Sequence, residues 1–306
     1  MKKTFLTLAM GMALTTGMVM TSCGGEKKTE GEQTTEEAAG EEKAEAKKAL
    51  ELPADCKVYD TNTMAAGKEN TSANVAIDKK TGFISDGAFE GNAAIETLYF
   101  DHQIEMTGVA GFKDCKNLKE VKADSPIRFV SDNCFEGCTS LKEFDVETHS
   151  IGISGFEGCT SLEKVNIHRG FGVDGKGIDP YLFSRAFANC TALKTVIVPL
   201  TLDKFEDDVF EGCTAIEELA LPYNFNKQII KGTAKAKGIK KLFVLSIMPF
   251  GFPNTDAGKA FNKAQCTAYV PDALINDFKN DASWADFAAI KPLSESGYYD
   301  AEGNIK

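Results

Sequence analysis

Histidine, acidic and cysteine side chains are the residues of this sequence that could support catalysis or bind a metal. The histidines are His102, His149 and His168, and Glu147 lies close to the last two. A catalytic nucleophile needs a base within reach, and a metal needs several such ligands together. Motifs such as HExxH, GxSxG or the P-loop, with its phosphate-binding Lys-Ser or Lys-Thr, are absent from the sequence. His149 and His168 could approach one another, but we interpret all three as solvent-exposed rim residues and predict no enzyme, cofactor or metal site.

A glycine-rich segment at 170–180 contains Asp174 and Asp179 and superficially resembles a calcium loop. Its two aspartates lack the ligand spacing of an EF-hand. We therefore predict a loop that stands off the edge of a sheet, a kind of loop that often determines binding specificity.

Nine cysteines in one chain could indicate a disulfide framework. Five of them, however, occupy one repeated position: Cys115, Cys138, Cys159, Cys190 and Cys213. Stacked parallel side chains do not readily reach disulfide geometry, so we predict buried free thiols that pack as small hydrophobes. Cys56, Cys134 and Cys266 lie outside this column and could behave differently.

One short pattern occurs six times in the middle of the chain. Its copies are 89–95, 112–118, 135–141, 156–162, 187–193 and 210–216, each running from a Phe to a Leu or Ile. The fourth residue of each copy falls at 92, 115, 138, 159, 190 and 213, so the intervals are 23, 23, 21, 31 and 23 residues. A weaker copy follows, with Ala236 at the fourth position and Ile239, Leu242 and Val244 at the apolar positions. Such periodicity is typical of solenoids.

Each copy predicts a helical turn followed by a strand. Apolar residues six and eight positions after the Cys position alternate as in a half-buried strand. Asp86, Asp132, Ser184 and Asp207 precede the Phe by three residues and are potential N-caps. Two residues after each Phe stand residues that readily adopt positive φ: Gly91, Asp114, Gly137, Gly158, Asn189 and Gly212. A single unit cannot bury its apolar residues, whereas stacked units can.

The pattern Ala-Phe-x-Gly-Cys-[Thr/Ser]-[Ser/Ala]-Leu-x-x-Val-x-Ile resembles the BspA-type leucine-rich repeat of bacterial surface proteins. The resemblance covers residues 84–245. It implies an α/β fold, a right-handed solenoid with a parallel concave β-sheet and short convex helical turns, capped at both ends. It also implies a role in adhesion or in binding host molecules.

Strand residues between the buried ones should face the concave surface, where a ligand could bind. They are polar and acidic in the first half of the array and apolar in the second. The predicted binding residues are Tyr99, Asp101, Lys122, Asp124, Asp145, Glu147, Asn166, His168 and Phe243. The alternative is a solvated face with an apolar end that a cap covers.

The first fifty residues indicate export and anchoring. Residues 1–22 combine Lys2 and Lys3 with an apolar run too short to span a bilayer, as in a signal peptide. Met20-Thr-Ser-Cys23 resembles a lipoprotein lipobox, which implies lipidation of Cys23; the alternative is an ordinary signal peptide. Residues 24–50 contain eight Glu and five Lys and predict a disordered tether.

The remaining boundaries follow from the repeats: an N-terminal cap at 51–83, repeats at 84–245 and a C-terminal strand and helical cap at 246–306. Val75–Ile77 and Tyr269–Pro271 predict strands, and Leu274, Ile275, Phe278, Trp284, Phe287 and Ile290 predict two short helices. The net charge of −11 argues against nucleic-acid binding.

We expect a non-enzymatic, exported lipoprotein anchored to a membrane, at the cell surface or outer membrane rather than the inner membrane. Its concave face would bind an extracellular or envelope protein or glycan. The alternative is a structural envelope lipoprotein without a dedicated ligand.

Overall fold

The computed structural model describes residues 50–171, 177–178, 180–202, 204–206, 208–222, 238–248, 250–252 and 262–306. The predicted signal peptide, Cys23 and the tether up to residue 49 lie outside this range. So do residues 172–176 and 179 of the predicted loop, with Asp174 and Asp179, and Ala236 and Asp207. Residues 47–306 form one compact unit, to which the following description applies.

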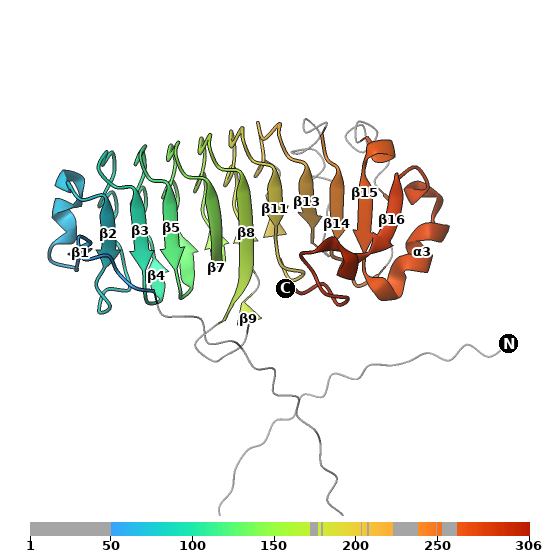
Figure 1. Ribbon diagram of the computed structural model, residues 1–306, viewed down its shortest axis with the longest axis horizontal. Coiled ribbons are helices and arrows are strands. Elements are labelled where there is room, and N and C mark those ends of the chain that lie inside the picture. Colours follow the sequence, from blue (N-terminus) through green and yellow to red (C-terminus); the bar gives the residue numbers. More distant parts are fainter. Residues whose placement is uncertain are drawn as a thin grey trace, which may run out of the picture. The chain divides into compact units, whose positions relative to one another are not determined.

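Parallel strands stack one per repeat into the predicted sheet (Figure 1). In chain order they are β1 (Lys57–Tyr59), β2 (Asn74–Ile77), β3 (Thr97–Phe100), β5 (Glu120–Ala123), β7 (Glu143–Ile151), β8 (Lys164–Phe171), β11 (Thr195–Ile197), β13 (Glu218–Leu221), β14 (Lys241–Val244), β15 (Thr267–Val270) and β16 (Ala289–Pro292). Neighbours pair in parallel, in register, except at one step, from β5 to β7. We call the outer surface of these strands the concave face.

A second parallel ladder forms where several repeats bend. It joins β4 (Ile104–Met106), β6 (Ile127–Val130), the second half of β7, β10 (Tyr181–Leu182) and β12 (Lys204–Phe205). At the long insertion, β8 pairs antiparallel with β9 (Gly177–Ile178). The sequence predicted a loop here, and its described flanks form a two-stranded ribbon.

The predicted helical turn of each repeat is a series of hydrogen-bonded turns. In the third repeat Glu136 N–H bonds within the turn to Asn133 O (3.1 Å), whereas Phe135 N–H bonds to Gly155 O of the next repeat (2.8 Å). A helix would use both donors internally. Positive φ at all six predicted positions, from Gly91 to Gly212, confirms that part of the prediction and lets the chain alternate in this way.

The predicted N-cap residues also link repeats. Oδ1 of Asp86 accepts the N–H of Val109 at 2.7 Å, and Oδ1 of Asp132 accepts that of Ile153 at 2.7 Å. In both pairs the donor belongs to the following repeat, so the predicted capping of the residue's own turn is wrong.

Two side-chain columns run through the core. The rings of Phe89, Phe112, Phe135, Phe156, Phe187 and Phe210 stack nearly parallel, with centroids 5.0–5.8 Å apart. Beside them, each column cysteine donates its thiol to the carbonyl of the Phe one repeat earlier; Cys115 Sγ lies 3.1 Å from Phe89 O and Cys213 Sγ 3.0 Å from Phe187 O.

The column thiols are free and buried, as predicted. Burial raises the pKa of Cys115 to about 12, which keeps that thiol protonated and able to donate. Cys134 and Cys266 are likewise buried and free, whereas Cys56 is partly exposed.

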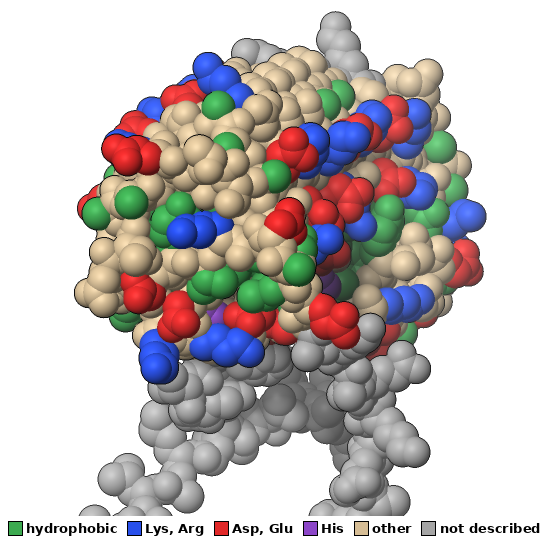
Figure 2. Space-filling view, turned by 60° about the vertical axis from the view of Figure 1, so that its left-hand side comes forward, with side chains coloured by type: hydrophobic (Ala, Val, Ile, Leu, Met, Phe, Trp, Pro, Cys, Tyr) green, Lys and Arg blue, Asp and Glu red, His purple; other side chains and the backbone are tan. Residues whose placement is uncertain are grey.

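Ion pairs connect neighbouring repeats on the outside. They include Lys119–Glu96 (2.7 Å), Lys113–Glu136 (2.9 Å) and Lys194–Glu163 (2.9 Å). Figure 2 shows charged side chains of opposite sign next to one another in rows. Because water screens exposed pairs, each of them contributes little to the stability of the fold.

The short helical segments of the described chain are η1 (Met64–Glu69), η2 (Lys263–Gln265), η3 (Asp272–Leu274), α3 (Ile275–Asn280), η4 (Ala282–Trp284) and η5 (Leu293–Ser296). Trp284 and Phe278 are fully buried among them. Ile290 lies on β16, which pairs with β15, and not on a helix. The sheet therefore continues one strand beyond the predicted last one.

Phe135→Ala should lower the free energy of unfolding by about 3–5 kcal/mol, the usual cost of removing a buried aromatic ring. Phe135 stacks on both Phe112 and Phe156 and is fully buried. Urea titration followed by circular dichroism measures the effect. Lys142→Ala is the control, because Lys142 is exposed and lies just before β7. A loss below about 1 kcal/mol would show that the stacked column is not the core.

Candidate functional site

Two segments of the chain cross the concave face. The first, which we call the N-terminal strap, comprises residues 50–56. Leu50 N–H donates to Asp124 Oδ2 (3.1 Å) just after β5, and Asp55 Oδ2 accepts from Asn74 Nδ2 (3.0 Å) on β2. The strap therefore passes over β3, where Tyr99 is only 6% exposed (Figure 1).

The second segment, residues 293–306, is called the C-terminal strap. Tyr299 Oη donates to Val198 O (2.8 Å) and accepts from Val198 N–H (3.3 Å). Tyr298 Oη donates to Glu218 Oε2 (2.8 Å). Burial of the phenol and the nearby negative charge of Glu218 raise the pKa of Tyr298 to about 12. Both tyrosine rings pack on Phe243, with centroids 5.4 and 5.6 Å from its own.

Phe243 is therefore inaccessible to a ligand in this structure. Its side chain is fully buried, as are Ile197, Ala220 and Leu245 in the same half of the sheet. The C-terminal strap thus covers the apolar half of the concave face. This agrees with the alternative interpretation of the sequence, in which a cap covers the apolar end. Covering it removes a large apolar surface from water.

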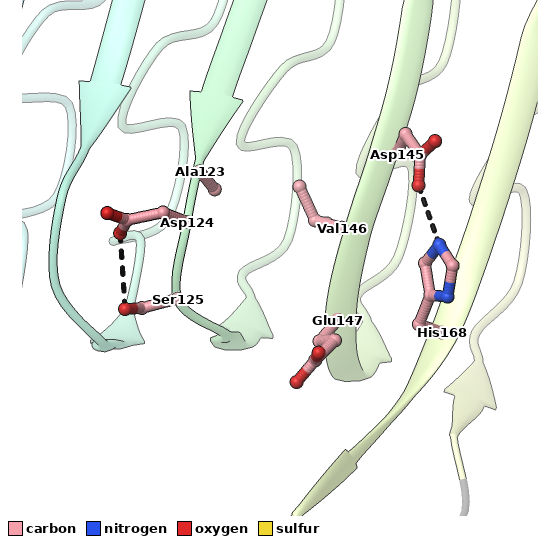
Figure 3. A pocket seen from close by; sticks show the side chains of 7 residues that line it. All are labelled: Ala123, Asp124, Ser125, Asp145, Val146, Glu147 and His168. Atoms are coloured by element: carbon pink, nitrogen blue, oxygen red, sulfur yellow. Dashed lines mark hydrogen bonds and ion pairs between the residues drawn. The ribbon is translucent and has the colours of Figure 1, made fainter. Parts of the chain in front are cut away.

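The concave face is open between the straps, over the end of β5, β7 and β8. A depression there is lined by Ala123, Asp124, Ser125, Asp145, Val146, Glu147 and His168 (Figure 3). A second depression shares Glu147 and His168 and extends to Leu200 and Asn304 beside the C-terminal strap. We call Asp124, Asp145, Glu147 and His168 the acidic window; the hollow on the right of Figure 2 carries acidic side chains along it.

The depression lies where the sheet is interrupted. β5 and β7 approach at Lys142 N–H and Lys119 O (3.4 Å), and the chains pair again at Ile127 and Thr148. The difference in residue number between paired residues is 23 at the first point (142 − 119) and 21 at the second (148 − 127). The β5 repeat therefore has two more residues between these points than the β7 repeat has. The 21-residue interval between Cys138 and Cys159 was the sequence signal for this irregularity.

Within the window His168 and Asp145 form a hydrogen-bonded pair on neighbouring strands. His168 Nε2 lies 2.7 Å from Asp145 Oδ1, and this bond lowers the pKa of Asp145. The two side chains remain 34% and 49% exposed. Figure 3 shows the Glu147 carboxylate pointing away from this pair.

The other histidines lie elsewhere. His149 is 2% exposed, its ring meets Phe129 edge to face, and its Nδ1 accepts from Arg128 Nε at 3.5 Å. The prediction of an exposed rim residue is wrong for His149, because β7 runs straight into the second ladder and carries it inside. His102 contacts Asp101 Oδ1 (3.1 Å) and Thr81 O (3.0 Å).

The remaining predicted residues are engaged within the protein. Asp101 is 9% exposed at its side chain and pairs with Lys79 (3.2 Å). Lys122 pairs with Glu120 (3.2 Å) and lies over the ring of Tyr99. Asn166 lies opposite Asp145 in the sheet, on β8. The structure thus brings together the middle of the predicted set and separates its ends from it.

In the described part of the chain, no group of three or more His, Cys, Asp or Glu is arranged to hold a metal ion. Among the same residues, no helix has the length and hydrophobicity needed to span a membrane.

The repeat geometry agrees with the comparison to known families. A model described as the BspA type leucine rich repeat region (6 copies) matches residues 68–185 and 180–233, more than half of the chain. The chain belongs to the BspA-type leucine-rich repeat family. This membership indicates a binding or scaffold role, in a family that is typically non-catalytic and commonly surface-associated.

Solved structures of similar proteins include a leucine-rich repeat protein of T. pallidum, with 21% identity, coverage of 55% of this chain and 77% of that one, and a TM-score of 0.43. Another, from Bacteroides ovatus, has 15% identity, coverage of 73% and 57%, and a TM-score of 0.38. This chain thus spans little more than half of the latter protein. No curated protein matches the chain.

Tyr299→Phe should destabilise the protein by about 1–3 kcal/mol, because it leaves the buried N–H and C=O of Val198 without their partner. Thermal or urea unfolding measures this. Tyr298→Phe, which loses one bond to the partly exposed Glu218, serves as the matched control and should cost less. Equal effects would contradict the anchoring role given to Tyr299.

Asp145→Asn should make the free energy of unfolding depend less steeply on pH at acid pH. The pKa of Asp145 is depressed in the folded state, so its stabilisation is present above the unfolded value of about 3.9 and is lost as pH falls through the lower native value. Melting temperatures of wild type and variant between about pH 2 and pH 5 test this. Glu143→Gln, at an exposed carboxylate on the same strand, is the control; the same slope in wild type and Asp145→Asn would refute the coupling.

Proposed function

We propose that this protein is a non-enzymatic, exported lipoprotein, anchored through Cys23, that binds an extracellular or envelope protein or glycan at the acidic window. The observation that supports the window is the pair of straps. They occupy the N-terminal and apolar parts of the concave face and leave accessible the strands that carry Asp124, Asp145, Glu147 and His168.

The chemistry of the window favours a ligand with positive charge or with many hydrogen-bond donors. Asp124, Asp145 and Glu147 line one depression, and carboxylates accept but do not donate when ionised. Like charges that line one depression repel, so a cationic partner would relieve the repulsion. A basic segment of a protein meets this requirement more directly than a neutral glycan.

The 27 residues from 24 to 50 support presentation of this surface away from a membrane. A flexible chain of that length has a root-mean-square reach of roughly 30 Å. A structural envelope lipoprotein without a ligand would need the tether but not an open window between two straps.

Ligand capture by the full-length protein from a panel of host and envelope proteins and glycans tests the proposal. Glu147→Gln should weaken capture by up to about 1 kcal/mol, the range of an exposed ion pair, and the effect should shrink in high salt because exposed charges are screened within about 8–10 Å. Glu136→Gln, a carboxylate on the opposite turn side, is the control. Binding that is lost with Glu136→Gln but kept with Glu147→Gln would place the site elsewhere.

A further inference from the structure

A row of exposed apolar side chains lies on the second ladder, away from the acidic window. Phe83 is 63% exposed, Met106 42% and Phe129 40%. Phe83 pairs with Met106, and Met106 with Phe129, so the three stand on consecutive repeats. We call them the apolar strip. Val109 and Ile153, each 45% exposed, extend the apolar character of this region onto the following turns.

Such exposure is costly for a protein in water. Soluble proteins scatter single apolar residues over the surface, whereas adjacent large ones indicate a site of association with protein or membrane. The concave face shows the contrast, because there a strap covers the apolar residues.

Charge distinguishes the strip from the window. Next to the strip, Arg128 Nη1 pairs with Glu105 at 2.7 Å, and the guanidinium of Arg128 also lies over the ring of Phe129. The charges of Arg128 and Glu105 cancel each other, and the carboxylates at the adjoining turns, Asp86 and Asp132, each accept a backbone N–H, from Val109 and Ile153. The acidic window carries three carboxylates and would be repelled by anionic lipid headgroups.

The tether enters the body on the repeat that carries Phe129. Leu50, the first described residue, bonds to Asp124, which lies five positions before Phe129 on the same repeat. In Figure 1 the start of the described chain and β4 lie at the same edge of the sheet. A 27-residue tether ending there would hold the strip at high effective concentration beside the anchoring membrane.

We propose that the apolar strip docks on the lipid surface to which Cys23 anchors the protein, so that the body lies with its second ladder toward the bilayer. The inference rests on the lipid anchoring in the proposed function. A covalent lipid and an apolar contact together make the stable two-signal attachment that peripheral proteins use.

The test uses the full-length acylated protein on phosphatidylcholine vesicles with brominated acyl chains. Phe129→Trp places a fluorophore in the strip, and Val58→Trp places one at a residue of similar exposure, 45%, on β1. The native Trp284 is fully buried and serves as a constant background. Bromine should quench about half of the added fluorescence at position 129 and little at position 58, because docked side chains reach about 5–10 Å into the interface.

Vesicle flotation of wild type and Cys23→Ala separates the two proposals. Anchored protein with equal quenching at both positions would overturn the docking and leave the anchoring intact. Wild type that floats no better than Cys23→Ala would overturn both. If the added fluorophore at position 129 is shielded without vesicles and Phe129→Ser turns a dimer into a monomer, the strip contacts a second copy and the proposal is wrong; thermal unfolding of each variant confirms that it is folded.

Discussion

The backbone hydrogen bonds between repeats are the constraint on which the rest of this structure depends. Each turn alternates between a donor used inside the repeat and a donor given to the next one, as at Glu136 and Phe135. This alternation fixes the spacing of the repeats, and that spacing lets the phenylalanine rings stack face to face about 5 Å apart. No single repeat can satisfy these groups alone, so each repeat depends on its neighbours for its stability.

The stacked core also explains where the protein can accept irregularity. Two extra residues between Glu120 and Ile127 interrupt the sheet on the concave side, yet Phe135 and Phe156 remain stacked behind the gap. The insertion after β8 likewise leaves Phe156 stacked on Phe187. Variation at the sheet edge and on its open face is tolerated because the aromatic and thiol columns lie on the other side of the core.

The repeated residues made most of the architecture predictable. The columns of Phe, Cys and Leu, the positive φ at Gly91 and its equivalents, and the strand at 241–244 follow from types that recur at fixed offsets. The two straps could not be predicted in the same way, because residues 50–56 and 293–306 occur once and contain no periodic pattern. The strand pattern therefore places Phe243 on the surface, although Tyr298 and Tyr299, more than fifty positions later in the chain, cover it. Similarly, the place of His149 depends on β7 running unbroken from one ladder into the other, which the alternation of apolar residues does not specify.

The thiol column gives the array a direction. Every column cysteine donates toward the N-terminal end, and at the first position Asn92 stands instead, with Nδ2 near the carbonyls of Gly67, Lys68 and Asn70 (2.8–3.1 Å). A duplicated repeat inserted in the middle of the array could be accommodated. Its cysteine could donate to the Phe carbonyl of the repeat before it, and its own Phe carbonyl could accept from the cysteine of the repeat after it. One inserted ahead of Asn92 would meet a cap that only an amide fits. Gene duplication can therefore lengthen this protein from within, while its N-terminal end stays fixed.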